Sequence, residues 1–103
     1  MKFIDLKSKI QFSPVKLNRD AVFSSPELNI NLYCLEVGQK LESCHCKEPT
    51  ILYCVGGEGY FFQNSEKVLA RYGSMLICDQ KDECRADAKE RFVILEISGV
   101  KNA

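Results

Sequence analysis

The sequence predicts an all-β domain, a small barrel or sandwich, and three observations support this. Short segments rich in alternating or clustered apolar residues recur along the chain, with turn-forming residues between them. No stretch combines a helical period with helix caps. The length of 103 residues suits one packed core and is too short for two.

The clearest predicted strand covers 29–37. Its alternation places Tyr33 and Leu35 on one face and Leu32 and Cys34 on the other, which is typical of a strand covered on both sides. The other expected strands are 51–55, 60–63, 67–70, 75–78 and 91–97. The glycine-rich run 56–59 and the polar run 64–66 are interpreted as turns, the second closing a hairpin.

We expect a single domain over 1–103, with the barrel at about 29–98. Residues 1 to about 28 are less regular, since Pro14 and Pro26 interrupt them. We expect this part to be an extended arm that covers the barrel or pairs with a neighbouring subunit. The composition of 82–89 would allow a turn of helix, but the segment is too short to assign.

Charge and hydropathy exclude several kinds of partner. Fourteen basic and fourteen acidic residues cancel, so we expect neither nucleic acid nor an anionic membrane surface as a partner. The N-terminus lacks the apolar run of a signal peptide, and no segment is long enough to span a bilayer. We therefore expect a cytoplasmic protein. In a reducing compartment, six cysteines favour metal binding or redox chemistry over stable disulfides.

Two of these cysteines have a spacing that suits a shared ligand. Cys44 and Cys46 are two residues apart, and on a strand this spacing places both side chains on one face. Such a pair can bind one metal ion but is badly placed to form a mutual disulfide.

The spacing of glycines around these cysteines resembles that of the cupins. Gly38 opens a segment like the first cupin motif, with the two histidine positions at Cys44 and Cys46 and the glutamate position at Thr50. Gly73 opens a segment like the second motif, with its histidine position at Cys84. The resemblance covers about residues 30–98. It implies a jelly-roll-like double-stranded β-helix, with the side chains at 44, 46, 50 and 84 converging inside the barrel.

The resemblance does not supply the usual histidine site, because each of these ligand positions carries a different residue. Three of the four are cysteine, and thiolates prefer soft or borderline metals. We expect zinc, with iron or copper as alternatives, and Cys54 as a candidate fourth ligand. The same cysteines could instead be small apolar core residues left after metal binding was lost. Thr50, Tyr53 and Tyr60 are candidate residues of a ligand pocket.

These residues favour a binding module for a thiophilic metal or a small ligand. A metal-dependent enzyme, a dioxygenase or isomerase acting on a small organic acid or sugar, is the alternative, and so is a metal-free barrel that binds a small molecule. The sequence does not decide between an enzyme and a binding protein. We expect a homodimer, because an open sheet edge needs cover.

Overall fold

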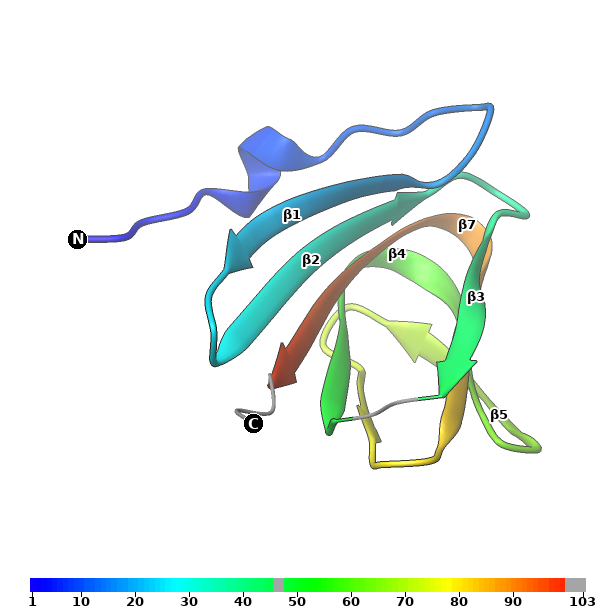
Figure 1. The fold of residues 1–103 in the computed structure, drawn as a ribbon. Coiled ribbons are helices and arrows are strands. Elements are labelled where there is room, and N and C mark those ends of the chain that lie inside the picture. Colours follow the sequence, from blue (N-terminus) through cyan, green and yellow to red (C-terminus); the bar gives the residue numbers. More distant parts are fainter. Residues whose placement is uncertain (46–47, 100–103) are drawn as a thin grey trace.

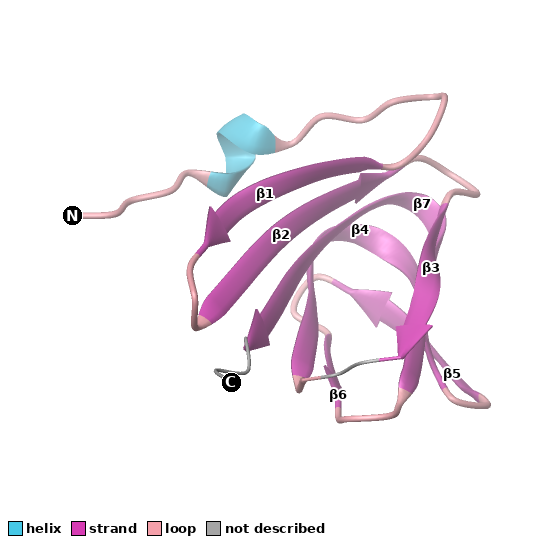
Figure 2. Ribbon diagram, in the orientation of Figure 1, coloured by secondary structure: helices cyan, strands magenta, loops and turns pink. Residues whose placement is uncertain are grey.

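The fold is taken from a computed structural model that describes residues 1–45 and 48–99, without the side chains of 43–45. The elements are η1 (Leu6–Lys9), β1 (Asn18–Ser24), β2 (Leu28–Leu35), β3 (Lys40–His45), β4 (Thr50–Gln63), β5 (Glu66–Arg71), β6 (Met75–Cys78) and β7 (Glu83–Gly99). The all-β prediction is confirmed, and the strands curve around a common interior (Figure 2).

Two long antiparallel strands, β4 and β7, form the middle of the barrel. The second half of β7 lies between β2 and the first half of β4, and β1 and β6 extend this part of the sheet. The first half of β7 pairs with β3 and with the second half of β4, which in turn pairs with β5. Each long strand therefore takes part in both halves of the barrel (Figure 1).

The glycine-rich run 56–59 was predicted as a turn, and this prediction was wrong. β4 continues through it and stays paired with β7, while the register shifts between Cys54 and Gly56 and again between Gly57 and Gly59. Gly57 has a φ of +76°, and a Cβ there would overlap the backbone carbonyl oxygen of Arg91. The glycines thus let β4 bend sharply against β7 without leaving the sheet.

The expected hairpin turn at Asn64 is confirmed, with β5 beginning at Glu66. The unassigned segment 82–89 contains the start of β7 rather than helix. No helix of the described residues is long and apolar enough to cross a membrane.

The core lies on both faces of the β2–β7 sheet. The larger cluster fills the barrel interior and contains ten buried residues: Tyr33, Leu35, Leu52, Cys54, Phe61, Ala70, Ala86, Ala88, Phe92 and Ile94. A second cluster, around Leu32, Cys34 and Val93, lies on the outer face and is covered by Ile10 and Phe12 of the N-terminal segment. That segment runs alongside β1 (Figure 1). The N-terminal part of the chain also contributes β1 to the sheet.

Candidate functional site

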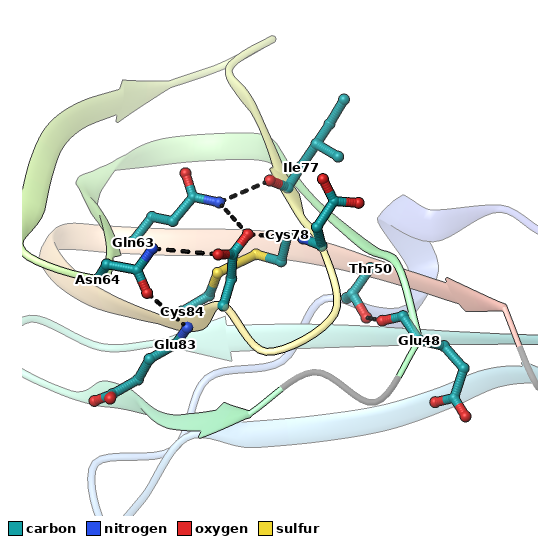
Figure 3. The surroundings of a disulfide bond; sticks show 10 residues. Glu48, Thr50, Gln63, Asn64, Ile77, Cys78, Glu83 and Cys84 are labelled. Carbon is teal, nitrogen blue, oxygen red and sulfur yellow. Dashed lines mark hydrogen bonds between the residues drawn. A yellow bond between two sulfur atoms is a disulfide. The ribbon is translucent and has the colours of Figure 1, made fainter.

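A disulfide joins two successive strands, β6 and β7, at one end of the barrel interior. Cys78 is the last residue of β6 and Cys84 lies at the start of β7; their Cα atoms are 6.6 Å apart. Both side chains are buried, with 0% and 5% of their surface exposed, and they pack against Leu76. The bond therefore spans the β6–β7 turn on its inner side (Figure 3).

The backbone at both cysteines is held by other strands. Thr50 of β4 pairs with Cys78. Cys84 pairs with Gln63 at the far end of β4, and on its other side with Cys44 of β3. Four segments of the chain thus meet around this disulfide, and three of the positions are cysteines.

The turn between the two bonded cysteines is fixed by the carboxylate of Asp82. One oxygen accepts hydrogen bonds from Gln63 Nε2 and from the Asp79 backbone N–H, each at 3.0 Å, and the other accepts from Asn64 Nδ2 at 3.2 Å (Figure 3). The bond from Asn64, followed by that from Asp79, lowers the pKa of Asp82. The carboxylate is therefore ionised at neutral pH and joins the turn to the end of β4.

The structure describes the predicted metal ligands only in part. The backbone of Cys44 lies opposite Cys84, whereas its side chain and the whole of Cys46 lie outside the described residues. Cys84 is bonded to Cys78. Among the residues whose side chains are described, no group of three His, Cys, Asp or Glu could hold a metal ion.

The structure does not bring Cys54 to this disulfide. Its thiol is fully buried in the larger core cluster and donates a hydrogen bond to the carbonyl oxygen of Gly56 at 3.4 Å. Cys34 is equally buried, but on the outer face beneath the N-terminal segment. Burial raises the pKa of both thiols, so each is protonated at neutral pH and packs as a small apolar side chain.

The three predicted pocket residues point in different directions. Thr50 shares a strand face with the buried Leu52, and its hydroxyl donates to the carbonyl oxygen of Glu48 at 3.1 Å. Tyr53 lies on the opposite face of β4 from Leu52. Tyr60 also lies on the outer face, where the ammonium group of Lys67 is 4.3 Å from its ring centroid. The two tyrosines therefore do not line the barrel interior.

A polar cluster on the inner face was missed by the sequence analysis. Asn31 of β2 donates a hydrogen bond to Glu96 Oε1 of β7 at 2.9 Å, and the hydroxyl of Tyr33 donates to the same oxygen at 3.4 Å. Glu96 is also the register partner of Leu52. Asn31 and Glu96 each interrupt an otherwise apolar strand, and this pattern in the sequence could have indicated the cluster.

The electrostatics of this cluster centre on Tyr33. Burial raises its pKa, the Glu96 carboxylate raises it further, and the guanidinium group of Arg19 on β1 acts in the opposite direction. The cluster therefore presents a neutral phenol beside a carboxylate, with a guanidinium group at its edge. Such groups can bind a molecule that both donates and accepts hydrogen bonds.

Comparison with known proteins identifies the fold. No family model matches the chain, and no curated protein matches its sequence. Solved structures match closely in shape. A protein from Thermus thermophilus has a TM-score of 0.90 at 21% identity, covering 99% of this chain and 100% of its own. An RmlC-like cupin from Desulfovibrio desulfuricans has a TM-score of 0.88 at 19% identity, covering 96% of each chain.

KdgF from Halomonas is similar over 97% of this chain and 94% of its own, with a TM-score of 0.82 and 18% identity. The expected resemblance to cupins is thus confirmed at the level of the fold. The chain is a cupin-type double-stranded β-helix.

Proposed function

We propose that this protein is a binding module that holds a thiophilic metal ion on cysteine thiolates when the Cys78–Cys84 disulfide is reduced. The observation that carries the proposal is the register of β3 and β7, in which Cys44 lies opposite Cys84 while Cys84 is bonded to Cys78. Three cysteine positions from three strands therefore meet at one end of the barrel.

The donor chemistry of these residues fits a soft or borderline cation. Reduction of the disulfide frees two neighbouring thiols, and the backbone of a third cysteine, Cys44, is the register partner of Cys84. Thiolates of this kind bind zinc, iron or copper(I), and zinc takes four ligands in a tetrahedral site. Cys46 is a candidate for the fourth by sequence, although it lies outside the described residues. Cys54 is left out, because it packs in a different core cluster.

When bound in this position, zinc would either close a structural site or, with one open position, polarise a bound molecule. The chain's own contribution is to keep the thiols together. Pairing of β6 and β7 with β4, and the hydrogen bonds of Asp82, hold the backbone on both sides of the turn. A preorganised site of this kind loses little entropy on binding.

Zinc competition against a chromophoric chelator tests this proposal. The protein is first reduced and handled without oxygen. We expect stoichiometric uptake by the wild type, loss of uptake in Cys84→Ala, and unchanged uptake in Cys34→Ala, whose thiol lies on the outer face. The proposal is wrong if the fully reduced wild type takes up no zinc, or if both variants weaken uptake equally.

The polar cluster favours a second candidate, a metal-free barrel that binds a small hydroxylated molecule. Glu96 accepts hydrogen bonds, and Tyr33 and Asn31 can exchange their present bonds for bonds to a ligand. Chemical-shift mapping with a panel of sugars and small hydroxy acids tests this candidate. Shifts centred on Tyr33 that disappear in Glu96→Gln would support it, whereas a panel without saturable shifts would exclude these ligand classes.

The homodimer and the cytoplasmic location stay predictions. The mass from sedimentation equilibrium tests the first, and a mass of one chain would contradict it. An enzymatic role has no further support from the described residues.

A further inference from the structure

We infer that Cys78 and Cys84 form a reversible dithiol–disulfide couple that switches the binding site: the oxidised form closes it and the reduced form opens it. The switching of metal binding rests on the proposed function, whereas the couple itself stands on the geometry of the β6–β7 turn. No other described pair of cysteines in the chain is bonded.

The fold around the couple does not depend on the bond. Cys78 is held in the sheet by its pairing with Thr50, and Cys84 by its pairing with both Gln63 and Cys44. The disulfide spans only six positions of sequence, so it constrains a short loop that the sheet already fixes. Both redox forms can therefore share one barrel.

The Asp82 carboxylate keeps the two sulfurs together after reduction. Its hydrogen bonds reach across the turn to Asp79 and out to Gln63 and Asn64, none of which involves a sulfur atom. The reduced thiols thus stay adjacent, and re-formation of the bond is intramolecular. A couple of this kind cycles without unfolding.

The other two described cysteines lie in different core clusters from the Cys78–Cys84 pair. Cys54 is fully buried beneath the bend of β4, and Cys34 is buried beneath the N-terminal segment, on the opposite side of the sheet. Burial raises the pKa of both thiols, which lowers the fraction of reactive thiolate. Oxidation therefore returns to the Cys78–Cys84 pair rather than to these residues.

Because both sulfur atoms are buried, the exchange needs a local opening of the β6–β7 turn and a thiol reductant such as glutathione. Two reductant thiols attack in sequence: the first forms a mixed disulfide with one cysteine and releases the other as a thiol, and the second displaces the remaining cysteine. The protein gains two electrons and two protons, its S–S bond breaks, and the reductant leaves as its own disulfide. The reverse reaction uses a small disulfide as the oxidant.

Equilibration of the whole protein in mixtures of reduced and oxidised glutathione tests the couple. Acid quenching, alkylation and mass spectrometry then count the free thiols and locate them by peptide. We expect Cys78 and Cys84 to interconvert together within the range of these mixtures, with an unchanged circular dichroism spectrum. A pair that stays oxidised in fully reduced glutathione, or never oxidises in any mixture, overturns the inference.

Two further arms separate the couple from the proposed metal site. Asp82→Asn should shift the equilibrium toward the dithiol by about fivefold for each hydrogen bond lost, whereas Asp79→Asn, on the same turn, should leave it unchanged. Added zinc should also shift the equilibrium toward the dithiol, because the metal binds only that form. A couple that cycles but ignores zinc would refute the metal site and leave the couple standing. Equal shifts in the two variants would refute the role of Asp82.

Discussion

Replacement of Gly57 by alanine should destabilise the barrel more than the same replacement at Gly56 in β4 or at Gly38 in the loop before β3. Two costs coincide at this residue. Its φ of +76° is unfavourable for an L-residue, and an added Cβ would overlap the backbone oxygen of Arg91 on the neighbouring strand. The Arg91 backbone cannot move aside as the end of a side chain can. In Gly57→Ala, β4 and β7 must therefore separate locally.

The magnitude follows from these two costs. A left-handed conformation costs an alanine about 1–2 kcal/mol. Loss of one or two ladder hydrogen bonds adds about 1 kcal/mol each. The sum is about 3 kcal/mol, which for a chain of this length lowers the melting temperature by roughly 14 °C.

Gly38→Ala is the matched control. Gly38 also has a positive φ, of +84°, but an added Cβ would meet nothing within 4 Å. It should therefore cost about 1 kcal/mol, or roughly 5 °C. Gly56→Ala, where the nearest atoms belong to the Val93 side chain at 3.9 Å, should be close to neutral. Urea unfolding followed by circular dichroism measures all three, and equal losses in Gly57→Ala and Gly38→Ala would refute the close contact of β4 and β7.

Three further predictions concern the disulfide, its turn and the polar cluster. The double variant Cys78→Ala/Cys84→Ala should lose about 2 kcal/mol of unfolding free energy, because the closed loop is short, and should melt roughly 10 °C lower. A loss of more than twice this size would show that the bond is essential to the fold. The pKa of Asp82 is lowered by folding, so its contribution to stability is complete above about pH 4 and is lost as the pH falls through the lower folded value. In Asp82→Asn, the urea midpoint of unfolding should therefore depend less on pH between pH 2 and 6. An unchanged pH dependence would contradict this. The pKa of Tyr33 is raised by burial and by Glu96, so absorbance at 295 nm should show a tyrosine that ionises above the ordinary range. Glu96→Gln should lower the pH at which Tyr33 ionises, and an unshifted titration in that variant would rule out the Glu96 contribution.

The overall fold and most strands could be predicted from the sequence, since both depend on local patterns, whereas β1, β3 and the start of β7 were not among the expected strands. The alternation in 29–37 correctly separated Tyr33 and Leu35, which lie in the barrel interior, from Leu32 and Cys34 on the outer face. The glycine run after Val55 could not be resolved in the same way. Glycines mark both turns and bulges, and only the pairing with β7 shows that the strand continues.

The site was harder to predict, because its contacts join distant parts of the chain. Asn31 and Glu96 are 65 residues apart, and neither has a neighbour in sequence that signals their hydrogen bond. The bond between Cys78 and Cys84 depends on how β6 and β7 meet at the turn, which no spacing rule supplies. Motif spacing predicted that the side chains of Cys44 and Cys84 converge. The register places their backbone positions opposite each other, and the side chain of Cys44 lies outside the described part of the chain.

The most direct test of the thiolate site is cobalt(II) binding, because sulfur-to-cobalt charge transfer absorbs strongly in the near ultraviolet and reports the ligand itself. The protein is reduced, titrated with cobalt(II) without oxygen, and then reoxidised with oxidised glutathione. We expect a saturable charge-transfer band in the wild type and in Cys34→Ala, its loss in Cys84→Ala, and its disappearance when the Cys78–Cys84 bond re-forms. Absence of the band from the reduced wild type, or its persistence at full strength in Cys84→Ala, would contradict a metal site at this end of the barrel.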